Sequence, residues 1–444
     1  MVWKSKKIKA AKELRITMLK QTATRIEQDL EYMKRFTATP GKGCTRLPFT
    51  KEAKEAAAYL QERMRQAGLS VKVDAAGNVL GTLHGADAAA PCVMMGSHYD
   101  SVVNGGDYDG IAGVICAIEL ADLLRRQKVQ LKRDLVIVAF CDEEGMRFGT
   151  GYFGSGALWG QRDIAYLKGH TDANGVTVYA AMQAYGLEPE EIEEAKLPAG
   201  RIGCFLEIHI EQGPVLEAED AELGIVEAIV GIRRLSVSVC GQADHAGAAP
   251  MHMRKDAVEA ASKVIAQIPG FARACGDGSV ATVGCITVEP GGVNIVAEKV
   301  GFSVDMRSKS KESIEKMQAQ VMDSLQNAEK QTGCSCKVTE TLRVEPVFLD
   351  EELIDTLGEY CRKKQYRYRL LVSCAGHDSL LMGQYVPTAM LFVPSCGGRS
   401  HCPEEYTESA ALAKAVSVMK ELTVQLLTQD EPAQRTGKCV DDDV

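Results

Sequence analysis

The sequence has no long apolar run, no basic block and no excess of charged residues. It comprises 444 residues, of which 45% are hydrophobic and 25% are charged. These values are ordinary for globular proteins and exclude disordered and fibrous chains. No segment approaches the roughly 18 consecutive apolar residues of a membrane helix. A formal net charge of -9 argues against binding to nucleic acid or to an anionic membrane, so we expect a small-molecule partner, with no nucleic acid and no membrane partner.

The chain also lacks the marks of an exported protein. Its 15 cysteines are odd in number and form no CxxC pair, which favours reduced thiols over a disulfide framework or a structural zinc site. The N-terminal segment MVWKSKKIKAAKELRITMLKQ is basic but has no apolar core, so it predicts an amphipathic helix and not a signal peptide. The sequence thus predicts a cytoplasmic protein.

Two patterns of strands and helices divide the chain. Between residues 69 and 140, short apolar strands alternate with helices, which predicts an α/β fold with a mainly parallel sheet and helices on both faces. Between 228 and 344, the order strand, helix, strand, strand, helix, strand is typical of a ferredoxin-like α+β unit. We predict one discontinuous domain at 1–227 and 345–428, an inserted domain at 228–344, and a mobile tail at 429–444.

Polar side chains follow the predicted buried strands, at the ends where ligands gather in α/β sheets. His98 and Asp100 follow the strand CVMMGS, and the glycine-rich loop NGGDYDGIAGV then presents Asp109. A carboxylate two residues from a histidine can accept the second N–H of that ring and so orient a metal ligand. On its own the HxD pattern is more often structural. The glycines could equally cradle a phosphate, although no Walker lysine or GxGxxG spacing accompanies them.

Three further strand ends carry side chains of the types that bind metals. Glu143 and Glu144 follow DLVIVAF, His209 lies in CFLEIHIEQG, and His401 follows TAMLFV and a glycine-rich loop. Two adjacent carboxylates at the end of a buried strand repel each other unless a cation or a proton is present. As a set, these imidazoles and carboxylates have the ligand mixture of a two-metal hydrolytic centre.

The same blocks resemble the M20 family of binuclear metallohydrolases, above all its amidase branch of N-carbamoyl-L-amino-acid hydrolases, ureidopropionases and allantoate amidohydrolases. The matching segments are GSHYDSVVNGGDYDGIAGV, FCDEEGMRFGTGYFGS, EIHIEQGPVLE, GQADHAGAAPMHMRKDA, GGVNIVAEKVGFSVDMR, AGHDS and PSCGGRSHCPEE. The resemblance implies a hydrolase acting on carbon–nitrogen bonds other than peptide bonds, with two divalent metal ions per subunit, Zn²⁺ first and Mn²⁺, Co²⁺ or Ni²⁺ as alternatives. The metal ligands that it implies are His98, Asp109, Glu144, His209 and His401, with Asp109 bridging the ions.

The resemblance also implies roles for residues around the metal ions. Glu143 corresponds to the general base, and Asp100 to the carboxylate behind His98. His245 corresponds to a residue that stabilises the developing oxyanion from a neighbouring subunit, which implies a homodimer and an inserted domain that acts as a lid and in dimerisation. The implied substrate-binding positions are Gln212, His245, Asn294, Arg307, Gly376 and His377. Arg307 could equally be a surface arginine of its strand, and His377 could serve only to brace its loop.

The chain departs from the usual family pattern in three motifs. HAGTTPM is HAGAAPM here, with Ala248 and Ala249 in place of two hydroxyls. GSR or GSK is GSG, which ends at Gly156, and GISH is GGRSH, which adds Arg399. The first change would loosen hydrogen bonds in the lid, and the last would favour a second anionic group on the substrate. Every implied metal ligand and the base are retained.

The sequence therefore predicts a metal-dependent amidohydrolase. It would remove the carbamoyl group of an N-carbamoyl-L-amino acid or a related ureido acid by means of a metal-activated water. Allantoate hydrolysis by the same residues is the alternative, and a dipeptidase or aminoacylase activity ranks third. A non-catalytic scaffold on the same fold would have lost Glu143 or a metal ligand, and none is lost.

Overall fold

The computed structural model describes residues 2–429, and the chain divides by its internal contacts into two units. The first unit comprises Met1–Glu227, Leu349–Leu371 and His377–Val444, and the second comprises Ala228–Phe348 and Val372–Gly376. The predicted mobile tail at 429–444 lies, from residue 430 onward, outside the described residues. Among the helices of the described residues, none combines the length and the apolar character needed to cross a membrane.

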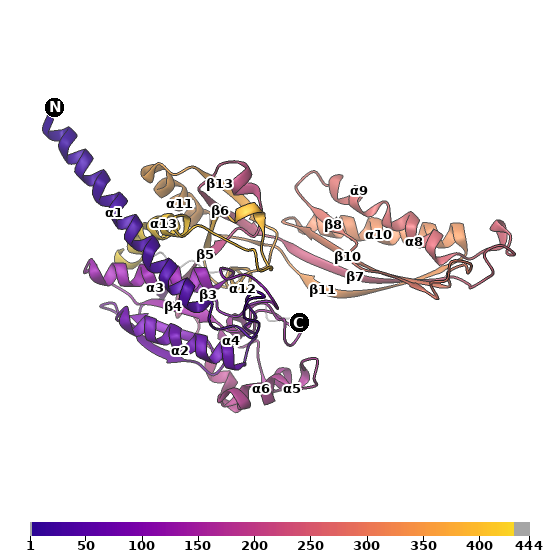
Figure 1. The fold of residues 1–444 in the computed structure, drawn as a ribbon, viewed down its shortest axis with the longest axis horizontal. Helices are drawn as coiled ribbons and strands as arrows, with labels where there is room; N and C mark the ends of the chain where they lie inside the picture. Colours follow the sequence, from indigo (N-terminus) through magenta and orange to yellow (C-terminus); the bar gives the residue numbers. More distant parts are fainter. Residues whose placement is uncertain (1, 430–444) are drawn as a thin grey trace. The chain divides into compact units, whose positions relative to one another are not determined.

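A nine-stranded sheet runs mostly through the first unit (Figure 1). Its order is β1-β2-β4-β3-β5-β14-β6-β12, and β13 also pairs with β6. The central strands β4, β3, β5 and β14 are parallel neighbours, whereas the pairs nearer the edges are antiparallel. The strands are β1 (Ser70–Val73), β2 (Val79–Leu83), β3 (Cys92–His98), β4 (Leu135–Phe140), β5 (Ile202–Ile210), β6 (Leu223–Ile229), β12 (Val347–Phe348), β13 (Tyr368–Ser373) and β14 (Thr388–Val393).

Helices cover both faces of this sheet. Every residue of β3, β4 and β14 is buried, which requires cover on both sides. The helices α3 and α13 pack against β3 and β5, while α4 and α12 pack against each other and against β4 and β5 respectively. The mainly parallel α/β fold expected from the sequence is confirmed. The helices of this unit are α1 (Val2–Met33), α2 (Lys51–Gln66), α3 (Ile111–Arg126), α4 (Phe153–Leu158), α5 (Ile164–Gly169), α6 (Val178–Tyr185), α7 (Val215–Ala218), α11 (Glu351–Lys364), α12 (Asp378–Met382) and α13 (Ser409–Thr428), with short 3₁₀ helices η1 (Pro189–Ala195) and η3 (Cys396–Gly398).

Local sequence explains how α3 comes to lie against the end of β3. The residue before the helix, Gly110, has a φ of 66°, in the left-handed region that favours glycine. A Cβ atom at this position would lie 2.3 Å from the ring of His98. Glycine therefore allows both the turn into α3 and the close approach of that turn to His98.

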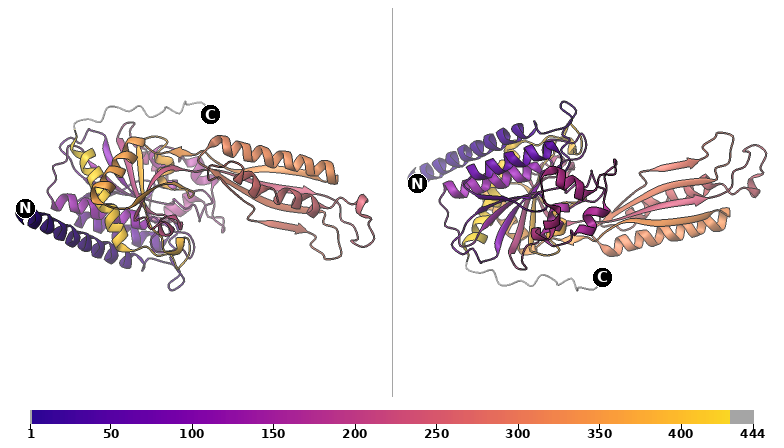
Figure 2. Two further views of the ribbon diagram at one scale, coloured as in Figure 1. Left: turned by 90° about the horizontal axis from the view of Figure 1, so that it is seen from above. Right: turned by 90° about the horizontal axis from the view of Figure 1, so that it is seen from below.

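The second unit is an antiparallel five-stranded sheet with helices on one face (Figure 2). Its order is β11-β7-β10-β8, with β9 also paired to β10. The third element of the expected order, a strand, is two strands here, β8 and β9, which pair with different stretches of β10. The elements are β7 (Gly231–Cys240), η2 (Met251–Met253), α8 (Ala257–Ile265), α9 (Ile268–Arg273), β8 (Val280–Thr282), β9 (Ile286–Glu289), β10 (Lys299–Ser308), α10 (Lys311–Thr332) and β11 (Ser335–Val344).

The two faces of this second sheet differ in polarity. Residues of β7 and β10 alternate between buried and exposed positions. The buried set, which includes Val237 and Phe302, forms one core with α8 and α10. The alternate positions carry charged residues, among them Arg234, Asp305 and Arg307. Arg307 therefore lies on the polar face of its strand.

Candidate metal centre

The parallel strands bring the predicted metal-binding residues to one edge of the sheet. His98 is the last residue of β3, His209 lies near the end of β5, and Glu143 follows β4. Because β4, β3, β5 and β14 are parallel neighbours, their carboxyl ends meet at the same edge. His401 follows β14, and Asp109 lies in the loop between β3 and α3.

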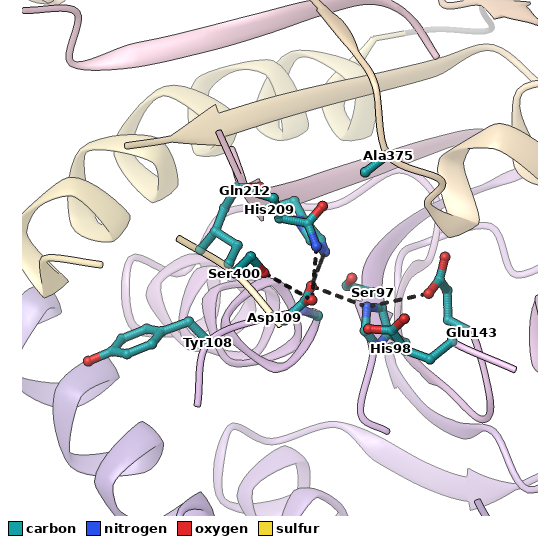
Figure 3. Close-up of polar contacts among 12 residues, drawn as sticks. Ser97, His98, Tyr108, Asp109, Glu143, His209, Gln212, Ala375 and Ser400 are labelled. Atoms are coloured by element: carbon teal, nitrogen blue, oxygen red, sulfur yellow. Dashed lines mark hydrogen bonds and ion pairs between the residues drawn. The ribbon is translucent and has the colours of Figure 1, made fainter. Parts of the chain in front are cut away.

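The carboxylate of Asp109 is the centre of this cluster (Figure 3). Its Oδ1 lies 3.2 Å from Nε2 of His209 and 3.7 Å from Nε2 of His98. Its Oδ2 lies 3.0 Å from Nε2 of His401, and that nitrogen is 3.3 Å from Oε1 of Glu144. The five predicted ligands therefore form two groups that share Asp109, one with His98 and His209 and the other with Glu144 and His401. A third group of possible ligands, His98, Glu143 and Glu144, overlaps both.

The donor chemistry at Asp109 fits divalent cations. Nδ1 of His209 donates to the carbonyl of Ile210 at 2.9 Å, and Nε2 of the same ring accepts the Gly110 N–H at 3.3 Å. Nε2 therefore faces Asp109 Oδ1 with a lone pair, and Oδ1 is buried without a hydrogen-bond partner. Two acceptors 3.2 Å apart attract each other only when a cation or a proton lies between them.

The histidines and carboxylates shift each other's pKa values as expected for such a cluster. Burial opposes charge on His98, but hydrogen bonding to Asp100 and the charges of Glu143 and Asp109 hold its pKa well above the ordinary value. Contacts with Asp109 and Glu144 raise the pKa of His401 to about 10. The site thus stabilises positive charge strongly, which is what a cation site requires.

Asp100 connects His98 to the turn that carries the two glutamates. Its Oδ1 lies 3.5 Å from Nδ1 of His98 and accepts the Glu143 N–H at 3.0 Å. Its Oδ2 accepts the Glu144 N–H at 3.2 Å. One carboxylate therefore orients the histidine ring and fixes the backbone of both glutamates, which is the role of a residue behind a metal ligand.

Glu143 has the environment of a proton acceptor with a raised pKa. Burial raises its pKa well above that of an ordinary glutamate, and Glu144, Asp378 and Asp100 raise it further against the opposing charge of His98. Its Oε2 lies 3.9 Å from Nε2 of His98, beyond hydrogen-bond distance. A carboxyl group with a raised pKa beside a cation site can accept and return a proton near neutral pH.

Two of the predicted substrate-binding residues, Gln212 and His377, lie in the same unit as the cluster. Gln212 has a φ of 57°, and its Nε2 donates to Asp109 Oδ2 at 2.9 Å. The ring of His377 is buried and packs edge-on against His209, with the ring centroids 4.4 Å apart. Burial above all holds the pKa of His377 well below the ordinary value, and its histidine neighbours lower the pKa further, so this ring is neutral.

The other four predicted substrate residues belong to the second unit: His245, Asn294, Arg307 and Gly376. Nδ1 of His245 accepts the N–H groups of Gly247 and Ala248 at 3.0 and 3.1 Å. These bonds leave the Nε2–H of an exposed His245 ring as a donor. Arg307 donates to Asp305 Oδ1 at 2.8 Å and to the carbonyl of Cys374 at 2.7 Å.

Two buried carboxylates support the cluster without having been predicted from the sequence. Oε1 of Glu405 accepts the N–H groups of Tyr108 and Asp109, both at 3.0 Å, and its Oε2 accepts the Ser400 hydroxyl at 2.6 Å and the His401 N–H at 3.3 Å. Glu405 thus joins the loops that carry Asp109 and His401. The sequence signal that could have pointed to Glu405 is its position shortly after the SHCP segment, which carries His401.

The second of these carboxylates, Glu207, lies on β5 in the same alternation as His209. It is fully buried and accepts the hydroxyls of Ser97 at 2.6 Å and Ser379 at 2.5 Å. Ser97 is next to His98, and Ser379 follows Asp378. The charge of Glu207, added to burial, raises the pKa of Asp378 to about 8.

The added cation Arg399 is matched by a neighbour in its own loop. Its Nη2 lies 3.0 Å from Oε2 of Glu404, and both side chains are about half exposed, at 52% and 60%. The ion pair reduces the charge that Arg399 could offer to an anionic group of a substrate.

Comparison with known proteins is in accord with this geometry. Residues 94–425 match the model of peptidase family M20/M25/M40. The chain is 40% identical over 404 residues to an N-carbamoyl-L-amino-acid amidohydrolase of Paenarthrobacter aurescens, covering 91% of this chain and 98% of that protein. It is 35% identical over 405 residues to an allantoate amidohydrolase of Escherichia coli, with coverage of 91% and 98%. A crystal structure of a hydantoinase/carbamoylase family amidase from Burkholderia multivorans superposes with a TM-score of 0.85 at 29% identity, covering 92% and 98%.

The fold and the cluster define a hydrolase with a candidate metal site. The match over residues 94–425 is decisive for the family, and the chain belongs to peptidase family M20/M25/M40. The resemblance inferred from the sequence motifs is thereby confirmed, as is the expected hydrolase class.

Proposed function

We propose that this protein is a metal-dependent amidohydrolase that cleaves the ureido group of N-carbamoyl-L-amino acids or related ureido acids. The observation that carries the proposal is the Asp109 carboxylate, whose two oxygens face two separate groups of imidazole and carboxylate ligands. The similarity to an N-carbamoyl-L-amino-acid amidohydrolase over 91% of the chain supports the substrate class. The similarity to an allantoate amidohydrolase supports allantoate as the alternative substrate.

The proposed cofactor is a pair of divalent ions, with Zn²⁺ preferred and Mn²⁺, Co²⁺ or Ni²⁺ as alternatives. His98 and His209 would hold one ion and Glu144 and His401 the other, with Asp109 shared between them. Imidazole and carboxylate ligands suit all of these metals. Bound ions would polarise the substrate carbonyl and lower the pKa of a water molecule.

Glu143 would then act as the general base. Its raised pKa allows it to take a proton from the attacking water and to return that proton to the leaving nitrogen. Water adds to the ureido carbonyl and one carbon–nitrogen bond breaks, which releases one nitrogen and leaves a carbamic acid. The carbamic acid then loses carbon dioxide as its remaining carbon–nitrogen bond breaks, so that the final products are ammonia, carbon dioxide and the free amine. Asp100 keeps Glu143 in place by accepting its backbone N–H.

Gln212 and His377 are proposed as substrate contacts of the first unit. The amide of Gln212 lies at the Asp109 carboxylate, which places it at the edge of the candidate centre. The neutral ring of His377 packs against His209 and can brace that ligand or contact the substrate.

The second unit is proposed to serve as a lid and as the interface of a homodimer. The fixed tautomer of His245 presents an Nε2–H, the donor that a developing oxyanion needs. Arg307, Asn294 and Gly376 are its other proposed substrate positions, and the Arg307 fork suits a substrate carboxylate. Exposed apolar side chains along β9, Ile286 at 55% and Val288 at 41%, support an interface. Light scattering that finds a monomer at micromolar concentration would contradict the dimer.

A cytoplasmic location is proposed on the state of the cysteines. All 14 cysteines among the described residues are free thiols, and seven of them are exposed or partly exposed. Free thiols are typical of proteins from reducing compartments.

The test of the proposed function is ammonia release by protein reconstituted with Zn²⁺ or Mn²⁺. The substrates are a set of N-carbamoyl-L-amino acids, allantoate and dipeptides, each with and without a chelator. We expect ammonia from one ureido class, lost with the chelator and restored by added metal. Cleavage of dipeptides alone, detected as free amine, would contradict the proposal.

A further inference from the structure

The side chain of Arg162 lies against the segment that faces the two glutamates of the candidate centre. Its Nη2 donates to the carbonyl of Tyr152 at 3.0 Å and to that of Gly151 at 3.3 Å. Its guanidinium also lies 4.6 Å from the ring centroid of Tyr166. The side chain is half-buried, so these carbonyls are its principal partners on that side.

The position of the guanidinium depends on the absence of a side chain at Gly156. A Cβ atom on Gly156 would lie 2.7 Å from Nη2 and 2.8 Å from Cζ of Arg162. Any other residue at 156 would therefore displace the guanidinium.

The carbonyls that Arg162 holds belong to a segment paired with the base-bearing turn. Tyr152 N–H donates to the carbonyl of Glu143 at 3.0 Å, and Phe153 N–H donates to that of Asp142 at 2.9 Å. Asp142 and Tyr152 have φ angles of 60° and 57°, in a region that non-glycine residues seldom adopt. The strained residues Asp142 and Tyr152 lie in two segments that are joined by these backbone hydrogen bonds. A contact that fixes the backbone of residues 151–153 therefore also fixes the backbone of residues 142–143.

We infer that Arg162 is a positioning residue for Glu143. Through the carbonyls of Gly151 and Tyr152, it holds the segment on which the backbone of Glu143 rests. The inference rests on the proposed function in one respect, since it takes Glu143 to be the base.

A double-mutant cycle of Gly156→Ala and Arg162→Ala tests whether the two positions share one contact. Each single change should lower kcat by about ten- to hundredfold, because a displaced base reacts poorly. KM should change by less than about threefold, and the metal content should stay the same, since no proposed ligand is moved. On the Arg162→Ala background, adding Gly156→Ala should change kcat by less than about twofold. Independent, multiplicative effects of the two changes would overturn the inference.

The exchange variant, Gly156→Arg combined with Arg162→Ala, tests whether a guanidinium carried by position 156 can take over the contacts of Arg162. Gly156→Arg alone places two cations in one half-buried space and should lower kcat, whereas the double variant should recover activity above either single variant. A double variant no better than the worse single variant would contradict the role of the guanidinium. A loss of bound metal in Arg162→Ala would overturn the positioning role, since the effect would then be on the metal site.

Arg201→Ala is the matched control. Arg201 also joins a carbonyl, that of Ala90, to its surroundings and pairs with Asp134, but it precedes β5, at the opposite end of the sheet from His209. It should lower the unfolding midpoint without changing kcat.

The wild-type assay tests the proposed function separately from the role of Arg162. A wild type that cleaves only dipeptides would refute the proposed substrate class and leave the cycle readable, because the base would be the same.

Discussion

The candidate metal centre of the first unit and the polar sheet face of the second unit compensate their carboxylates in opposite ways. In the first unit, the carboxylates of Asp109 and Glu144 are buried or nearly so and form their ion pairs with histidines. In the second unit, Asp305 lies on the polar face of its sheet and pairs with both Arg234 and Arg307. The carboxylates of the candidate metal centre are thus paired with histidine rings, which can lose their charge, whereas Asp305 is paired with arginines, which stay charged.

This difference shows which carboxylates need a cation from outside the chain. A buried carboxylate is unfavourable unless it is paired, and a neutral imidazole does not supply the missing charge. On the polar sheet face of the second unit, Asp305 is paired with two arginines. The first unit leaves Asp109 Oδ1 without a hydrogen-bond partner beside two imidazoles, which is an arrangement that a bound metal would complete.

The largest expected effect separates proton transfer from metal binding in the first unit. Replacing Glu143 by glutamine should lower kcat by about a hundredfold or more, because the amide cannot accept the proton of the attacking water. The metal content should stay the same, since Glu143 is not one of the five proposed ligands. Metal analysis of the purified variant and its kcat on the active ureido substrate measure the two effects. Unreduced turnover would refute the assignment of the base.

An intermediate effect is expected at Glu405, which joins the loops of Asp109 and His401. A glutamine here would turn its NH₂ group either toward the N–H groups of Tyr108 and Asp109, which would lose two hydrogen bonds, or toward the His401 N–H, which would lose at least one. The affinity for the ion at Glu144 and His401 should fall by about ten- to hundredfold. Competition with a chromogenic chelator measures this affinity.

The control for Glu405 is its neighbour Glu404. That side chain is exposed and pairs with Arg399, so Glu404→Gln should leave the metal affinity within about twofold of the wild type. If both variants bind metal as tightly as the wild type, the Glu405 carboxylate does not support the ligand loops.

The clustering of the proposed ligands could be predicted from the sequence because it follows from the sheet. Buried apolar strands identify the parallel core, and the residues after each strand then lie at one edge. Glu405 was missed because its role depends on a contact between distant loops. A Cβ atom on Gly106 would lie 2.1 Å from Glu405 Oε1, so a glycine far away in the sequence makes room for that carboxylate.

The division between β8 and β9 could not be predicted from the sequence for a related reason. The alternation of residues continues through 280–289, so the pattern alone indicates one strand. The break reflects pairing with β10, whose residues 305–307 bind β8 and 299–302 bind β9. Ser303 lies between these two stretches of β10. Its side-chain hydroxyl, and not its backbone carbonyl, accepts the Cys285 N–H at 3.1 Å.

The smallest expected effect tests the second unit, where a carboxylate is satisfied by the chain itself. Asp277 accepts hydrogen bonds from Ser279 N–H at 3.0 Å, from the Ser313 hydroxyl at 2.7 Å and from the Ser308 hydroxyl at 3.3 Å. Burial opposes ionisation, but these bonds lower the pKa of Asp277 to about 2. The ionised carboxylate therefore stabilises the folded state above about pH 4, the unfolded pKa, and this contribution is lost as the pH falls toward 2.

Replacing Asp277 by asparagine should lower the free energy of unfolding at pH 7 by about 1 kcal/mol, a value that allows for solvent screening at this partly exposed site. The difference from the wild type should shrink as the pH falls from 4 toward 2, because the wild-type carboxylate then becomes protonated. Urea unfolding at a series of pH values measures this, with the exposed Asp323→Asn on α10 as control. A difference that stays constant with pH would mean that the charge of Asp277 does not stabilise this unit. The contrast between a carboxylate that the chain itself satisfies and the carboxylates of the candidate metal centre would then be wrong for the second unit.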